Sequence, residues 1–359
     1  MTILENPFVG ADLGLTGLSG VPAAAGPQKA KDYTSDQEVR WCPGCGDYVI
    51  LATVRGFLAD LGLERENLMF VSGIGCSSRF PYYLEAYGIH SIHGRAPAIA
   101  TGMAVTRPDL SVWVVTGDGD ALSIGGNHLI HALRRNVNMT ILLFNNRIYG
   151  LTKGQYSPTS ETGKVTKSTP MGSIDHPFNT LSVALGAEAT FAARALDSDR
   201  AGLTEVLRAA AEHRGTSFVE ILQDCPIFND GSFDALRREN AESHLVRLRH
   251  GQPIRFGADS EFAVVRDGFG LRVAKADSVA ESDIVVHDAY TDHPEYAYAL
   301  SRLSDQDLTH VVTGVFRSVA RPTYDDGVRV QQGVAAERKP VSPGSLQELL
   351  TGRETWTVG

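Results

Sequence analysis

Two short polar motifs could supply the oxygen ligands of a metal ion. The first is "GDGD" (residues 117–120), which follows the apolar run "SVWVVT", and the second is "NN" (residues 145–146), which follows "MTILLF". A carboxylate, an amide oxygen and a backbone carbonyl are half of the octahedral oxygen set that suits Mg²⁺, while phosphates and water provide the rest. The glycines allow the backbone to approach a bulky ligand, and the helix expected after them directs its N–H groups at an anion.

The four cysteines of the chain form a second candidate site. Cys42 and Cys45 stand in "WCPGCG", Cys76 stands in "GIGCSS" and Cys225 stands in "DCPIF". Each one alone is typical of a buried apolar thiol. As a set, a CxxC pair with two further thiols predicts a four-cysteine site for Zn²⁺ or for an iron–sulfur cluster. The residue pattern leaves the choice between these two open.

Both sites need a scaffold that brings strand ends together. Between residues 42 and 230, short apolar segments alternate with amphipathic segments of roughly 10–15 residues, which predicts strands separated by helices. The strands are expected at 67–73, 111–117, 139–146 and 217–223, and the helices at 48–62, 96–107, 123–136 and 200–215. This alternation predicts an α/β fold with a parallel sheet and helices on both faces. One helical crossover would then place "GDGD" and "NN" at the same edge of the sheet.

Composition divides the chain into four parts. Residues 1–34 are rich in Gly, Pro and Ala and predict an extended arm, while residues 35–232 form the α/β domain. Residues 233–325 predict a small α+β appendage, with a hairpin that turns at Asp267-Gly268 and short strands at 283–288 and 309–316. Residues 326–359 predict a loosely packed arm.

Charge and hydropathy exclude several classes of partner. The net charge is −9 and no long basic block offsets it, which argues against binding to nucleic acid or to an anionic membrane. No apolar run approaches the roughly 18 residues of a membrane-spanning helix. The first residues lack the basic and apolar regions of a secretory signal, so a cytoplasmic location is expected.

Six motifs, in order, closely resemble the β subunit of 2-oxoacid:ferredoxin oxidoreductases. They are "WCPGCG", "GIGCSSRFPYY", "HSIHGRAPAIATG", "TGDGDALSIGGNH", "NNRIYGLTKGQYSPTS" and "DCPIFND". In this family, GDG followed at such a spacing by NN is the signature of thiamine diphosphate. The resemblance therefore implies Mg²⁺ bound by Asp118, by Asn146 and by the carbonyl of Ile148.

The resemblance also resolves the cysteine site. It implies that Cys42, Cys45, Cys76 and Cys225 hold one [4Fe–4S] cluster, next to the thiamine cofactor. The residues implied to contact the cofactor are Ile74, Gly75, Cys76, Ser77, His93, Gly119 and Asp120.

The sequence predicts only one of the two domains that a thiamine enzyme needs. Thiamine chemistry needs a second α/β domain and a carboxylate on the aminopyrimidine ring, and the sequence has room for only one such domain. The resemblance implies that an α subunit brings both, in an α2β2 heterotetramer. This chain alone would have no complete catalytic set. The complex would oxidatively decarboxylate a 2-oxo acid with coenzyme A and reduce ferredoxin, and it could also run in reverse.

The substrate is expected to be 2-oxoglutarate. Arg79 and Lys153 stand where the family reads its 2-oxo acid, and two cations suit a second carboxylate. The alternatives are a pyruvate-type or broad 2-oxo acid substrate. Two alternatives concern the function itself. The chain could be a non-oxidative thiamine decarboxylase with structural zinc, or a non-catalytic zinc scaffold.

Overall fold

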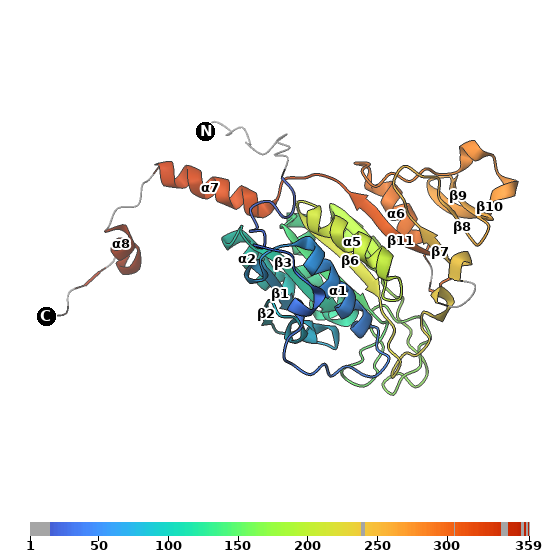
Figure 1. Ribbon diagram of the computed structural model, residues 1–359, viewed down its shortest axis with the longest axis horizontal. Coiled ribbons are helices and arrows are strands. Elements are labelled where there is room, and N and C mark those ends of the chain that lie inside the picture. Colours follow the sequence, from blue (N-terminus) through green and yellow to red (C-terminus); the bar gives the residue numbers. More distant parts are fainter. Residues whose placement is uncertain are drawn as a thin grey trace.

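The protein is built around an eight-stranded sheet (Figure 1). The computed structural model describes residues 15–237, 241–304, 306–338, 344–352, 355–356 and 358. The strand order is β2-β1-β3-β4-β6-β5-β11-β7. The first six strands are mutually parallel, and β11 runs antiparallel to β5. The strands are β1 Leu68–Ser72, β2 Tyr87–His90, β3 Ser111–Gly117, β4 Met139–Asn145, β5 Phe191–Leu196, β6 Thr216–Leu222, β7 Leu245–Arg247 and β11 Val311–Ser318. The predicted α/β fold is confirmed.

Helices cover both faces of this sheet. One face packs against α1 Asp47–Leu61 and α5 Arg200–Glu212. The other packs against α2 Ala96–Thr106, α3 Gly126–Arg135, α4 Thr180–Gly186 and α6 Pro294–Arg302. Because side chains alternate along a strand, residues 141 and 143 of β4 belong to one core and residues 142 and 144 to the other. This is why consecutive residues of the strand are apolar, as the sequence predicted. Strands β2 and β5 and helix α4 were not predicted.

The segment expected as an appendage is joined to the main sheet. Its strands β7 and β11 extend that sheet, while β8 Arg255–Phe256, β9 Phe262–Asp267 and β10 Gly270–Lys275 form a separate antiparallel sheet. The predicted hairpin is confirmed as β9 and β10, and Gly268 at its turn has a φ of 57°. The strand predicted at 283–288 is wrong, since the segment makes only isolated bridges at Ile284 and Val286.

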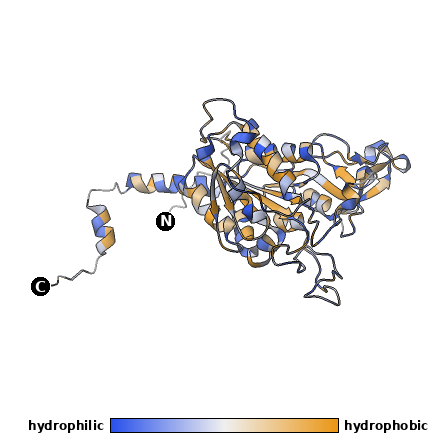
Figure 2. Cartoon of the chain, turned by 60° about the horizontal axis from the view of Figure 1, so that its bottom comes forward, coloured by the Kyte–Doolittle hydropathy of each residue, from blue (hydrophilic) through white to orange (hydrophobic). Residues whose placement is uncertain are grey.

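The two arms differ from each other. Residues 15–34 lie along the α/β domain, where the Gly17 N–H donates to the Glu212 carbonyl at 2.8 Å and Tyr33 is fully buried. Residues 1–14 of the expected arm lie outside the described part. The C-terminal arm contains α7 Tyr324–Arg338 and α8 Ser345–Thr351, which extend away from the body (Figures 1 and 2). These two helices were not predicted. No helix in the described ranges has the length and apolar character needed to cross a membrane.

Candidate functional site

The site lies at the carboxyl edge of the parallel sheet. Strands β1 and β3 are neighbours there, and their following loops diverge because β2 lies on the far side of β1. Such a switch in strand order opens a crevice where open α/β sheets bind ligands. All ten residues expected to contact the cofactor or Mg²⁺ line one cavity in this crevice. They are Ile74, Gly75, Cys76, Ser77, His93, Asp118, Gly119, Asp120, Asn146 and Ile148.

Asp118 is the buried carboxylate of this cavity, with 3% of its surface exposed. Its Oδ2 accepts hydrogen bonds from the Ser157 hydroxyl at 2.5 Å and from the Thr159 hydroxyl at 2.6 Å. Burial raises the pKa of Asp118 to about 6, and these two hydrogen bonds act in the opposite direction. The hydroxyls hold the carboxylate in one orientation, so its charge is fixed in the cavity wall next to Asn146.

Asp120 holds the loops around the cavity together through hydrogen bonds. Its Oδ1 accepts from the Ile74 N–H at 3.1 Å and from the Gly94 N–H at 2.7 Å, and it also pairs with His93 Nδ1. Its Oδ2 accepts from the Thr116 hydroxyl at 2.7 Å. These bonds link the loops after β1, β2 and β3 to one carboxylate, which positions His93 and Ile74 at the cavity.

The turn after β3 requires glycine at position 119. A Cβ there would lie 2.1 Å from the ring of Tyr149, whose hydroxyl donates to the Gly119 carbonyl at 3.0 Å. The next residues form a π-helical turn, Asp120–Ile124, before α3 begins. Irregular turns of this kind are common at functional sites because they redirect backbone groups towards a ligand.

Three loops bring the four cysteines into one region. A Cβ on Gly150 would lie 3.7 Å from the Sγ of Cys76 and 3.8 Å from the Sγ of Cys225, so both sulfurs lie next to Gly150. The turn that holds Cys42 and Cys45 is closed by a Cys45 N–H to Cys42 carbonyl bond of 3.1 Å.

Hydrogen bonds fasten these loops to each other. The Gly46 N–H donates to the Asp224 carbonyl at 3.2 Å, and the Trp41 indole N–H donates to the Cys76 carbonyl at 2.8 Å. The loops after β1 and β6 are thereby joined to the loop before α1.

The thiols influence one another electrostatically. Burial raises the pKa of Cys45 and raises that of Cys76 to about 11, and negative charge on Cys225 would raise both further. Asp47 has the same effect on these two thiols, and burial raises its own pKa to about 7. All four cysteines are free of disulfides. Among the described residues, no three His, Cys, Asp or Glu side chains converge as they would around a single metal ion.

The two expected substrate residues are not part of the cavity lining. Arg79 donates to the Arg40 carbonyl at 3.1 Å, and its charge lowers the pKa of Cys76, so it lies close to the cysteines. Lys153 is exposed and has a φ of 72° in the loop after Ile148. Leu151 and Thr152, which precede Lys153, do line the cavity.

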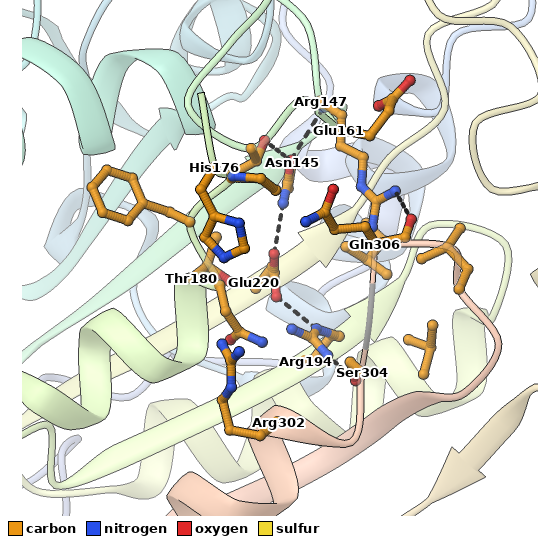
Figure 3. Close-up of a pocket in the computed structure, with 17 residues that line it drawn as sticks. Asn145, Arg147, Glu161, His176, Thr180, Arg194, Glu220, Arg302, Ser304 and Gln306 are labelled. Atoms are coloured by element: carbon orange, nitrogen blue, oxygen red, sulfur yellow. Dashed lines mark hydrogen bonds and ion pairs between the residues drawn. The ribbon is translucent and has the colours of Figure 1, made fainter. Parts of the chain in front are cut away.

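A second, polar cavity is shown in Figure 3. Its lining includes Asn145 and Thr159, which connect it to Asp118. Thr159 contacts Asn145 Oδ1 at 2.9 Å, and Asn145 Nδ2 donates to Glu220 Oε1 at 2.7 Å. Glu220 Oε2 accepts from Arg194 Nε at 2.6 Å, and both of these side chains are buried. Close polar contacts through Thr159 and Asn145 therefore connect Asp118 with a buried ion pair on β5 and β6.

Sequence reasoning missed several residues that shape the site. Ser157 and Thr159 stand in "YSPTS", where the sequence shows no reason for them to reach Asp118. Gln223 lines the cofactor cavity and donates to a cysteine sulfur, and Tyr149 packs on Gly119. These contacts join loops that are far apart in sequence, so spacing carries no signal for them.

Comparison with known proteins identifies one family, two related sequences and one similar solved structure. Residues 73–221 match the family described as "Thiamine pyrophosphate enzyme, C-terminal TPP binding domain". The "2-oxoglutarate oxidoreductase subunit KorB" of Mycobacterium tuberculosis is 71% identical over 362 aligned positions, which cover 100% of this chain and 97% of the relative. The "2-oxoacid:ferredoxin oxidoreductase 2, subunit beta" of Aeropyrum pernix is 44% identical over 199 residues, 55% of this chain and 64% of the relative.

A solved structure is similar over nearly the whole chain. It is a 2-oxoglutarate:ferredoxin oxidoreductase from Magnetococcus marinus with 2-oxoglutarate, coenzyme A and succinyl-CoA bound. The two chains are 34% identical with a TM-score of 0.72, and the match covers 92% of this chain and 99% of the other.

Proposed function

The chain belongs to the family of 2-oxoacid:ferredoxin oxidoreductase beta subunits, and we propose that it acts as the beta subunit of a 2-oxoglutarate:ferredoxin oxidoreductase. The complex would convert 2-oxoglutarate and coenzyme A to succinyl-CoA and CO₂, and would pass the electrons to ferredoxin. The observation that carries this proposal is the place of Cys76, which lines the cofactor cavity and also belongs to the four-cysteine group. A thiamine site and an electron carrier would share this loop.

The cavity fits magnesium-bound thiamine diphosphate. Asp118, Asn146 and the Ile148 carbonyl offer oxygen ligands in one wall. In the described part of the chain, no atom beyond Gly75 and its two neighbours in sequence lies within 4 Å of the position that a Cβ on Gly75 would take. Bound there, the cofactor would serve as the electron sink for decarboxylation of the 2-oxo acid. The residues of this chain would hold it: Ser157 and Thr159 orient Asp118, and Asp120 positions His93.

The cysteine region fits a [4Fe–4S] cluster. Four free thiols from three loops face one region, and Gly150 leaves space next to two of them. Cluster ligands stand around a cube of metal and sulfide, so their sulfurs lie further apart than the four ligands of one zinc ion. Burial raises the pKa values of Cys45 and Cys76, so binding of iron by these two sulfurs would displace their protons.

An alpha subunit would complete the site. The matched family segment is one thiamine-binding domain, and it occupies residues 73–221. We propose that the partner supplies the second domain and the glutamate that activates the cofactor, in an α2β2 assembly. The edge of the cavity that contains His93 and Leu151 would then be closed by the partner.

The experiment that tests this function is a reconstitution assay. The chain, coexpressed with its alpha subunit and purified without oxygen, should reduce ferredoxin with 2-oxoglutarate and coenzyme A. Each subunit alone should be inactive. Equal activity of this chain without a partner, or activity with pyruvate but not with 2-oxoglutarate, would contradict the proposal.

Arg79 and Lys153 are proposed to select the substrate within the assembled enzyme. Because a second carboxylate would pair with a cation, Lys153→Ala should raise KM for 2-oxoglutarate more than KM for pyruvate. Lys167→Ala serves as the matched control, since Lys167 is exposed like Lys153 but neither it nor its neighbours in sequence line the cavity. Equal changes for both substrates would remove Lys153 from the specificity argument.

A further inference from the structure

We infer that Gln223 is a positioning residue that sets the electron affinity of the cluster through a hydrogen bond to Cys45. The inference rests on the proposed function, because it requires a cluster on the four cysteines. Gln223 follows strand β6, between the cofactor cavity and the cysteines, and only 1% of it is exposed. Its side-chain Nε2 lies 3.2 Å from the Sγ of Cys45.

The orientation of the Gln223 amide is fixed by two acceptors. Nε2 donates one N–H to Cys45 Sγ and the other to the Asp224 carbonyl. A flipped amide would place its oxygen against a carbonyl oxygen and a thiolate, where neither contact could be a hydrogen bond. The backbone is held as well, since the Gln223 N–H donates to the Asn145 carbonyl at 3.0 Å.

The motif around Cys45 is shaped to admit this contact. A Cβ on Gly46 would lie 3.0 Å from the Cγ of Gln223 and 1.9 Å from Asp197 Oδ2. Glycine after Cys45 therefore allows the CxxC loop to lie directly against the residues that follow β5 and β6. The final glycine of "WCPGCG" is explained by this close approach.

Hydrogen bonds to cluster sulfurs change the reduction potential. The added electron increases the negative charge on the cluster and its sulfur ligands, so an N–H donor stabilises the reduced state more than the oxidised state. Backbone N–H groups at Ile227, Phe228 and Asn229 act to lower the pKa of the Cys225 thiol, and that of Asp47 acts in the same direction on Cys45. Substitution of a side chain does not remove backbone donors. The donor from Gln223 is a side-chain group, so a variant can delete it alone.

The test is a redox titration of the assembled enzyme, followed by electron paramagnetic resonance of the reduced cluster. Gln223→Leu keeps the size of the side chain and removes the donor. The equilibrium constant for cluster reduction should fall about tenfold, which lowers a one-electron potential by about 59 mV. Gln252→Leu, at an exposed glutamine before β8, is the matched control and should leave the potential unchanged.

The outcomes separate this inference from the proposed function. If the wild-type enzyme contains no iron and sulfide, the proposed function fails. If both proteins contain the cluster and their potentials coincide, the role of Gln223 is refuted while the proposed function stands.

A second measurement decides the matter if Gln223→Leu does not assemble a cluster. The wild-type enzyme, labelled with ¹⁵N only in glutamine side-chain amides, should show ¹⁵N coupling to the reduced cluster in pulsed paramagnetic resonance. Absence of that coupling would overturn the inference.

Discussion

Thr159→Val should weaken magnesium-dependent binding of thiamine diphosphate by about 10- to 100-fold. The Thr159 hydroxyl lies 2.6 Å from Asp118 Oδ2, and Asp118 is buried, so water does not replace the lost donor. A hydrogen bond to a charged group contributes about 1.5–3 kcal/mol, which corresponds to roughly 10- to 100-fold in affinity. Loss of comparable supporting contacts to metal ligands in other proteins has an effect of about the same size.

Calorimetric titration of the assembled enzyme with thiamine diphosphate, at fixed Mg²⁺, measures this effect. Thr204→Val is the matched control, because that hydroxyl makes an exposed hydrogen bond to the Arg200 carbonyl within helix α5. An affinity of Thr159→Val equal to that of the control would refute the reasoning that Asp118 needs both hydroxyls. A weakened affinity without Mg²⁺ dependence would also refute it, since Thr159 acts through a metal ligand.

Three other changes test the fold and the site. Glu220→Gln leaves the charge of the buried Arg194 guanidinium without a partner carboxylate, so it should lower the free energy of unfolding in urea by about 3–5 kcal/mol. A decrease of less than about 1 kcal/mol would show that water reaches the ion pair. Burial lowers the pKa of His213 to about 4, below its unfolded value of 6.5, so the contribution of His213 to the free energy of unfolding is highest above pH 6.5 and falls by about 3 kcal/mol as the pH falls towards 4. His213→Gln should flatten this part of the plot of unfolding free energy against pH, and an unchanged slope would contradict the prediction. Gly119→Ala places a methyl group against the Tyr149 ring and should abolish cofactor binding, measured by the same calorimetry, while retention of binding would show that the turn can shift.

The central strands and the polar motifs at their ends were predictable from the sequence for a physical reason. A strand buried on both faces carries consecutive apolar residues, as in residues 141–144 of β4, so it can be recognised without alignment. Parallel crossovers then require the strand ends to meet at one edge, which placed Asp118 near Asn146.

The remaining features depend on contacts between distant segments. Thr159 reaches Asp118 across 41 positions, and Gln223 reaches Cys45 across 178, and no local pattern records such pairs. Strand β11 joins the main sheet antiparallel to β5, which its own composition does not reveal. The strand predicted at 283–288 failed because apolar residues there fill the core beside β9 without pairing along a full strand.

The metal content of the anaerobically purified enzyme tests the four-cysteine site most directly. A brown protein with four iron and four acid-labile sulfide per beta chain, lost in Cys45→Ser, is the predicted result. A colourless protein that contains one zinc ion per chain would contradict a redox role for these cysteines.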